Sequence, residues 1–233
     1  MRYDINTGKG MRILDLFCGG GGSAMGLHQA FPEAEIVGVD IKPQPRYPFK
    51  FMQGDWSEVG ICRHWDLVWA SPPCQRYTSA APLQKREHPD LVALTRQRLR
   101  QCGISYVIEN VPGAPLENPA TLCGLTLGCN VKRHRLFEAS FPIFAPPCPR
   151  GHPGDWLIVF GWSALRRSSG GGTGPKKDRG KTKGKSVPHE EACRAMGIDW
   201  MTRAELSQAI PPAYSRYIGE QFKLSRKVDT QQS

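Results

Sequence analysis

The sequence predicts a doubly wound α/β fold built on a parallel sheet, because strand-like and helix-like segments alternate over its first two thirds. A second observation supports this fold class: polar and glycine residues follow the predicted strands at their carboxyl ends. Short apolar runs are expected to form the strands, at residues 11–17, 34–40, 49–55, 65–70 and 105–111.

Two helical patterns separate these strands. The first, at residues 23–31, follows a run of four glycines and stops before Pro32. The second, at residues 88–103, places Leu91, Leu94 and Leu99 at helical spacing and ends at a glycine. Each pattern lies between two predicted strands, as the crossover helices of a parallel sheet do.

Polar or flexible residues stand at the carboxyl ends of the predicted strands, namely Gly19–Gly22, Asp40, Asp55, Cys74 and Glu109. In open α/β sheets, ligands bind beyond this edge. The sequence therefore predicts one ligand site where these five features converge.

The remaining chain is expected to form a small lobe and a set of helices. Residues 1–144 would form the main domain, and residues 145–188 a small irregular lobe around the strand-like run 156–162. Residues 189–233 contain two short helical patterns and a longer one at 211–224 that begins with proline, and they are expected to return to the main domain.

Composition narrows the class of protein. No run of 18 apolar residues exists and the first residues do not resemble a signal peptide, so a cytoplasmic protein is expected. The eight cysteines contain no CxxC pair and are expected to remain thiols. The 31 Lys and Arg residues exceed the 21 Asp and Glu residues, for a net charge of +10. This favours a polyanion such as nucleic acid, with a merely cationic protein as the alternative.

Much of the positive charge falls in one glycine-rich polar stretch, residues 163–187, which contains a single acid, Asp178. Its composition does not suit independent folding. A flexible loop that settles on phosphates is expected, and a solvated linker is the alternative. The cations are Arg166, Arg167, Lys176, Lys177, Arg179, Lys181, Lys183 and Lys185.

Cys74 follows the buried strand 65–70 in the stretch SPPCQ. Prolines fix φ and stiffen the loop, so the thiol would be held firmly at the end of the strand. Such a thiol suits a nucleophile, although an ordinary buried turn could contain the same residues.

The glycine turn suggests a ligand contacted by backbone, because glycines permit close approach and a helix begins directly afterwards. Its spacing does not match a dinucleotide fingerprint. Asp40 ends the second strand, where a carboxylate can hold ribose hydroxyls, and Asp55 ends the third, where it can accept from an adenine amino group. An adenosine-bearing cofactor is therefore expected, and a structural turn with two surface aspartates is the alternative.

Five motifs occur in order along the chain: DLFCGGGG, SPPCQ, ENV, VKRHRLF and SQAIPPAYSRYIG. Together they resemble the motifs of the DNA cytosine-5 methyltransferase family, which uses S-adenosylmethionine. The likeness extends from Arg12 to Phe222, apart from residues 145–187. It implies a Rossmann-like class I methyltransferase sheet with a small target-recognition lobe, as in compact phage and prophage members.

The resemblance implies a role for each catalytic candidate. Cys74 would add to C6 of cytosine, which makes C5 nucleophilic. Glu109 would share a proton with N3, Arg135 would stabilise the charge at O2, and Arg133 would brace the arrangement. A methyl group then passes to C5, a base removes the C5 proton and Cys74 leaves; the sequence names no such base.

The resemblance also implies cofactor contacts. Phe17 would face the adenine, Gly20 and Gly22 the methionine end, Asp40 the ribose and Asp55 the adenine amino group. The other residues expected at the cleft are Ile41, Trp56, Pro73, Leu91 and Gln208. Departures from the family pattern are Gln208 where many relatives have Asn, Val131 where many have Gln, and Cys18 where Ala is frequent.

The sequence thus predicts a monomeric enzyme that methylates cytosine C5 in duplex DNA after the base is flipped out, in a bacterial nucleoid or a phage-infected cell. Gln75 and the loop cations would contact the DNA. Two alternatives remain: a catalytically silent DNA-binding relative and a tRNA cytosine-5 methyltransferase. No metal is expected, because a zinc site formed by Cys148, His152 and either Cys123 or Cys129 would need irregular spacing.

Overall fold

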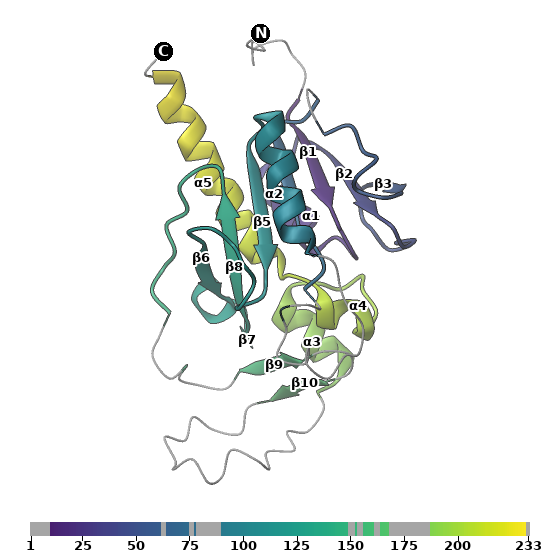
Figure 1. Ribbon diagram of the computed structural model, residues 1–233. Helices are drawn as coiled ribbons and strands as arrows, with labels where there is room; N and C mark the ends of the chain where they lie inside the picture. Colours follow the sequence, from purple (N-terminus) through teal and green to yellow (C-terminus); the bar gives the residue numbers. More distant parts are fainter. Residues whose placement is uncertain are drawn as a thin grey trace.

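A computed structural model describes residues 10–61, 64–74, 77, 90–148, 152, 156–160, 164–167 and 187–231. Its centre is a seven-stranded sheet with the order β3-β2-β1-β4-β5-β8-β6 (Figure 1). All neighbouring strands are parallel except β8, which runs antiparallel to β5 and to β6. The strands are β1 (Arg12–Leu16), β2 (Glu35–Asp40), β3 (Lys50–Gln53), β4 (Leu67–Ala70), β5 (Tyr106–Asn110), β6 (Ala120–Cys123) and β8 (His134–Ala139).

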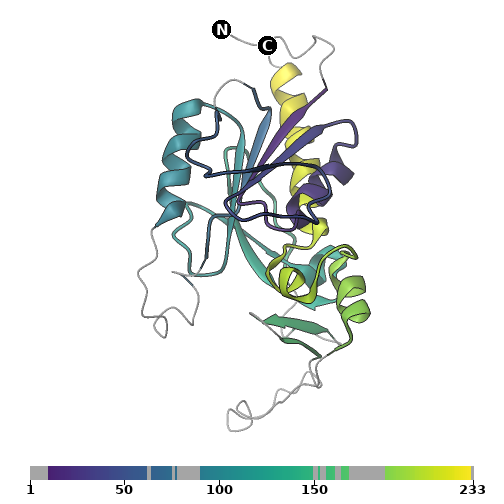
Figure 2. The ribbon, with the colours of Figure 1, turned by 90° about the vertical axis from the view of Figure 1, so that its right-hand side faces the viewer.

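The predicted doubly wound fold is confirmed, with helices on both faces of the sheet. Helices α1 (Gly22–Ala30) and α5 (Pro212–Gln231) lie together on one face, and α2 (Leu91–Cys102) lies on the other (Figure 2). The two faces bury separate apolar clusters, which is why the strands are apolar throughout. Leu27, Trp69 and Tyr214 belong to the α1/α5 side, and Val68 and Leu99 to the α2 side.

A smaller unit lies beyond the carboxyl ends of the parallel strands (Figure 1). It contains a three-stranded sheet of order β10-β9-β7 and two short helices that share an apolar cluster with Val131 and Leu157. The predicted strand at 156–162 is thus present as β9, whereas β10 was not expected. Its elements are β7 (Val131–Lys132), β9 (Leu157–Phe160), β10 (Ala164–Arg167), α3 (His189–Met196) and α4 (Arg203–Gln208), with the short 3-10 helix η2 (Gly124–Leu127) next to β7. The predicted domain boundaries stay predictions.

Two expectations about the chain as a whole can be compared with the structure. Among the described helices, none is both long and apolar enough to cross a membrane. The expectation that all eight cysteines remain thiols is wrong for Cys102, which is disulfide-bonded at the end of α2.

Helix α1 approaches the start of α5 so closely that glycine is required in it. A Cβ atom on Gly26 would lie 2.0 Å from the carbonyl oxygen of Pro212 and 2.2 Å from Oγ of Ser215. A Cβ atom on Gly22 would lie 2.2 Å from the carbonyl oxygen of Ile210. The contacts with the carbonyl oxygens of Pro212 and Ile210 are to backbone that cannot rotate away, so α1 packs against the start of α5 and the residues before it through glycine.

We therefore expect Gly26→Ala to lower the free energy of unfolding by about 3 kcal/mol, because overpacking outweighs the higher helix propensity of alanine. Denaturant unfolding of the purified protein measures this. Gly60→Ala is the matched control, because no heavy atom lies within 4 Å of its Cβ position. Equal stability of the two variants would contradict the packing argument.

Candidate active site

The glycine turn after β1 adopts backbone conformations that suit glycine. Phe17, Gly19 and Gly21 have φ values of 58°, 48° and 84°. The N–H of Gly19 donates to Oδ2 of Asp40 at 3.0 Å, and the N–H of Lys42 donates to Oδ1 at 2.9 Å. The Asp40 carboxylate thus fixes the turn against the end of β2.

The four consecutive glycines have different surroundings. A Cβ atom on Gly20 would lie 2.8 Å from Cε of Met201, and the clash of Gly22 with Ile210 is given above. Gly19 has no heavy atom within 4 Å of its Cβ position. Gly22 is thus required by its contact with backbone, whereas Gly20 meets only the flexible end of the Met201 side chain. The predicted contacts of both glycines with the cofactor stay predictions. Gly19 presents the open side of the turn, and four identical residues in a row gave no signal to distinguish it.

An aromatic pair stands beside the turn. The ring centroids of Phe17 and Trp56 are 5.5 Å apart, and the guanidinium of Arg98 lies 5.5 Å from the Trp56 ring centroid. Next to Trp56, hydrogen bonds from Ser57 lower the pKa of the half-buried Asp55 carboxyl. Phe17 follows β1, and Asp55 and Trp56 follow β3, so all three lie just after strand ends. Their predicted contacts with the cofactor stay predictions.

The other predicted cleft residues are spread more widely over the fold. Ile41 is 65% exposed just after β2, and Pro73 is exposed in the loop after β4. Leu91 begins α2, and Gln208 ends α4 with an exposed side chain. Their predicted contacts with the cofactor stay predictions.

Asp15 is a buried carboxyl that the sequence analysis missed. It lies in the apolar strand β1 and is fully buried. Ser23 Oγ donates to it at 3.1 Å and the Tyr47 hydroxyl at 3.3 Å. Burial raises its pKa to about 7, against the effect of these two hydrogen bonds. An acid within an apolar strand run was the signal available in the sequence.

The loop that carries Cys74 is anchored by its neighbours. The N–H of Ser71 donates to the carbonyl of Leu16 at 3.1 Å, which continues the pairing of β4 with β1. Asn110 Nδ2 donates to the carbonyl of Pro72 at 2.9 Å. Pro72 and Pro73 have fixed φ values, and these two hydrogen bonds tie the loop to β1 and β5. Cys74 comes directly after the two prolines and is half-buried.

Three charged groups surround the thiol. Nε of Arg135 lies 3.0 Å from Oε1 of the buried Glu109. Burial raises the pKa of Glu109, and the charges of Arg135 and Arg133 oppose this. Burial also raises the pKa of the Cys74 thiol, Arg135 opposes this and Glu109 adds to it. The structure therefore brings together the four residues predicted as catalytic.

Arg133 connects this site to the smaller unit. Its guanidinium donates to the carbonyls of Ser207 and Gln208 at 3.1 and 3.2 Å, and its own carbonyl accepts from the Tyr214 hydroxyl. Burial lowers its pKa to about 9, so the group remains charged at neutral pH. Arg133 thus fixes the end of α4 against the strand that carries Arg135.

The predicted DNA contacts cannot be placed in the same way. Arg166 and Arg167 lie on β10. The others lie outside the described residues: Gln75, Lys176, Lys177, Arg179, Lys181, Lys183 and Lys185.

Comparison with known proteins bears on the fold. No family model and no curated protein sequence matches the chain. Among solved structures, the Entamoeba histolytica methyltransferase EhMeth is similar with a TM-score of 0.60 and 13% identity, over 91% of this chain and 97% of that one. The chain has the class I S-adenosylmethionine-dependent methyltransferase fold.

Other solved structures overlap only in part. A coclaurine N-methyltransferase bound to N-methylheliamine and SAH has a TM-score of 0.31 and 13% identity, over 43% of this chain and 31% of that one. An O-methyltransferase assigned in Nostoc punctiforme has a TM-score of 0.36 and 12% identity, over 58% of this chain and 53% of that one.

In a class I methyltransferase sheet of this order, the strand sequence reverses direction between β1 and β4. Ligands of doubly wound sheets bind at such a switch point. The glycine turn follows β1 and the Cys74 loop follows β4, so both flank this position. The strand order thus places the glycine turn and the Cys74 loop on either side of the switch point.

Asp15→Asn is expected to change how stability depends on pH. Because burial raises the pKa of Asp15 from 3.8 to about 7, the folded protein binds this proton more tightly than the unfolded chain. The contribution to stability is present below pH 3.8 and is lost as the pH rises to about 7. The stability of Asp15→Asn relative to the native protein should rise by about 1.4 kcal/mol per pH unit in this window. Urea unfolding at pH 5 and pH 7 measures the difference, and a constant difference would contradict the assignment.

Glu109→Gln is expected to make Cys74 react faster with iodoacetamide at a fixed pH near neutrality. The Glu109 charge raises the pKa of this thiol. Removing that charge also takes away the ion-pair partner of Arg135, so the positive charge of Arg135 acts on the sulfur without opposition. Peptide mass spectrometry across a pH series gives the alkylation midpoint, which should move downward. Glu117→Gln is the control, since Glu117 pairs instead with Arg100. A midpoint that stays or rises in Glu109→Gln would refute the electrostatic coupling.

Proposed function

We propose that this protein is an S-adenosylmethionine-dependent methyltransferase that methylates C5 of cytosine in duplex DNA, with Cys74 as nucleophile. The observation that carries the proposal is the grouping of Cys74 with the Glu109–Arg135 pair at the carboxyl ends of the parallel strands. A thiol, a carboxylic acid and a guanidinium are the three groups that addition to a pyrimidine ring requires.

The residues around the glycine turn suit the proposed cofactor. The open side of Gly19 leaves room for a ligand against the backbone, and Asp40 at the end of β2 can accept from ribose hydroxyls. Phe17 and Trp56 offer ring surface for adenine, and the low pKa of Asp55 keeps it an acceptor for an amino group. When bound, S-adenosylmethionine supplies an electrophilic methyl group.

The chain's own residues account for activation of the ring. The Cys74 sulfur forms a bond to C6, and the electron pair of the C5–C6 double bond moves toward N3 and O2. Glu109, whose pKa is raised by burial, can give a proton to N3, and Arg135 donates hydrogen bonds to O2. After methylation at C5, a base removes the C5 proton, the C5–C6 double bond forms again and the sulfur of Cys74 leaves C6 as a thiolate. The proton on N3 returns to Glu109, which restores the acid.

The charge of the chain supports nucleic acid as substrate. The net charge is +10, and the cations of residues 163–187 would contribute phosphate contacts. A cytosine inside a duplex is out of reach of a thiol, so the base must leave the stack at a cost of about a few kcal/mol. Phosphate contacts would offset that cost and make binding strongly dependent on salt.

The proposal predicts a covalent complex with 5-fluorocytosine. Fluorine at C5 cannot leave as a proton does, so elimination of Cys74 is blocked after methyl transfer. A long duplex with all cytosines of one strand replaced by 5-fluorocytosine avoids the need to know the target sequence. With S-adenosylmethionine, the native protein should form an adduct that survives denaturing electrophoresis, and Cys74→Ser should form none. Glu109→Gln should slow adduct formation by about 10²–10⁴-fold.

Controls separate the alternatives. Cys193→Ser, a second buried cysteine, should trap as the native protein does. DNA binding without any adduct, by a folded native protein, would indicate a silent DNA-binding relative. Adduct formation with 5-fluorocytosine-containing tRNA but not with the duplex would indicate a tRNA methyltransferase.

A further inference from the structure

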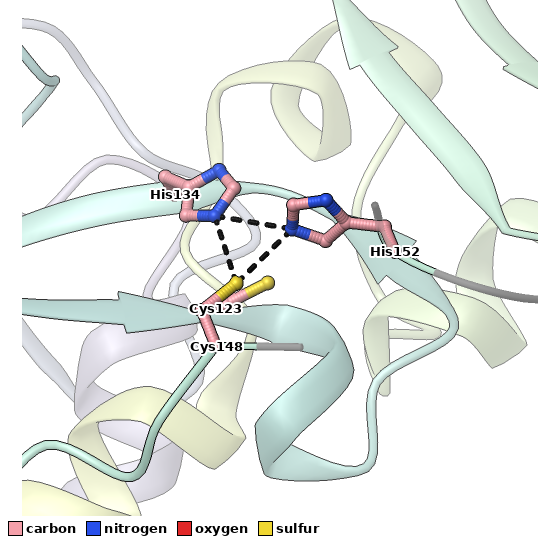
Figure 3. Close-up of side chains that lie close together, drawn as sticks. All are labelled: Cys123, His134, Cys148 and His152. Carbon is pink, nitrogen blue, oxygen red and sulfur yellow. Dashed lines mark hydrogen bonds between the residues drawn. The ribbon is translucent and has the colours of Figure 1, made fainter. Parts of the chain in front are cut away.

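Two cysteines and two histidines converge outside the site described above. They are Cys123, His134, Cys148 and His152, whose Sγ and imidazole nitrogen atoms all lie within 4.8 Å of one another. Figure 3 shows the two imidazole rings and the two thiol groups pointing into one small space. Cys123 is buried, the two histidines are half-buried and Cys148 is exposed, so the group spans the edge of the protein.

The separations agree with ligands around one tetrahedral ion. With zinc–nitrogen and zinc–sulfur bonds of about 2.05 and 2.3 Å, tetrahedral geometry places two nitrogens about 3.3 Å apart, and nitrogen about 3.6 Å from sulfur. Nε2 of His134 and Nε2 of His152 are 3.3 Å apart. Sγ of Cys148 lies 3.4 and 3.1 Å from these two nitrogens.

Hydrogen bonds alone account poorly for this arrangement. Each Nε2 atom has two close neighbours in the group. An imidazole nitrogen carries either one proton or one lone pair, directed along a single line in the ring plane. It can therefore point well at one partner only, whereas one ion between the four atoms is on the line of each lone pair.

The backbone holds the four ligand residues in place from different parts of the chain. Cys123 and His134 are direct partners in the β6–β8 ladder, so their side chains leave the sheet on the same face. The carbonyl of His152 accepts from Nε1 of Trp156 at 2.7 Å, and Nζ of Lys132 lies 4.8 Å from the centroid of the Trp156 ring. The fourth residue, Cys148, comes from the segment between β8 and β9.

We propose that Cys123, His134, Cys148 and His152 bind one zinc ion in a structural Cys2His2 site. Zinc is the metal that prefers two sulfur and two nitrogen ligands in a tetrahedron. All four positions are filled by protein, so the ion has no open position for catalysis. The spacing of the ligands looked irregular in the sequence because two of them are joined by strand pairing, and Cys129 is not among them.

The proposed ion would stabilise the part of β8 that leads into the active site. His134 precedes Arg135 in β8, and Nη1 of Arg135 donates to the carbonyl of His134 at 2.9 Å. Successive strand residues face opposite sides, so the ion would hold β8 from one side while Arg135 reaches the active site on the other. The ion would also fix the segment leading to β9 against β6 and β8.

Metal analysis of the full-length protein tests the site. The protein is purified without chelators and dialysed against metal-free buffer. Inductively coupled plasma mass spectrometry should then find about one zinc ion per chain, as expected for a closed four-ligand site. Replacement by cobalt should give the visible absorption of tetrahedral cobalt with a thiolate-to-cobalt band. Cys148→Ser changes an exposed side chain, so it should leave the fold intact and weaken zinc binding more than about tenfold.

Cys129→Ser is the matched control, because Cys129 neighbours the group in the chain without belonging to it, and it should retain the metal. Circular dichroism of each variant verifies folding. The proposal fails if the native protein binds neither zinc nor cobalt, or if Cys148→Ser binds zinc as tightly as the native protein. A non-reducing peptide map that finds a Cys123–Cys148 disulfide in native protein would also overturn it.

Discussion

The ion pair between Glu109 and Arg135 sets the conditions under which the rest of the site can exist. Glu109 is 6% exposed, and a buried carboxylate without a partner costs several kcal/mol. The strand next to β5 supplies the partner of this carboxylate. Strand β8 runs antiparallel to β5 and brings Arg135 to within 3.0 Å of the carboxylate. The reversed strand at this place in the sheet is therefore tied to the chemistry as well as to packing.

The active site carries more positive than negative charge. Two guanidinium groups, Arg133 and Arg135, face one carboxyl group, and Nε of Arg133 has no hydrogen-bond partner among the described residues. In surroundings of low polarity the surplus positive charge stabilises any negative charge that develops nearby. Burial is the largest cause that raises the pKa of Cys74 and Glu109 adds to it, so the two guanidinium charges oppose the main obstacle to forming the thiolate. The same surplus would stabilise electron density moved onto a bound ring.

Local pattern was enough to predict strands β1 to β5 and β9, and to place Cys74 and Glu109 at strand ends. Strands β6, β7, β8 and β10 were not predicted, and only the family resemblance pointed to Arg133 and Arg135. Apolar runs define buried strands, and the strand ends place Cys74 and Glu109 at one edge of the sheet. The sequence could not show which residues distant in the chain become neighbours. Gly20 and Gly22 lie against Met201 and Ile210 while Gly19 is open, and strand pairing joins Cys123 to His134. Both depend on register, which apolar pattern alone does not specify.

Strand β8 and the residue before it connect the two parts of the molecule. Glu138 at one end accepts a bidentate hydrogen bond from Arg96 of α2, so that end is fixed to the large sheet's covering helix. At the other end Arg133 bonds to the carbonyls of Ser207 and Gln208, and Lys132 in β7 pairs with β9. Any shift of the smaller unit must therefore pull on the residue two positions from Arg135. In the proposed DNA methyltransferase, these few residues would connect the smaller unit with the charged groups beside Cys74.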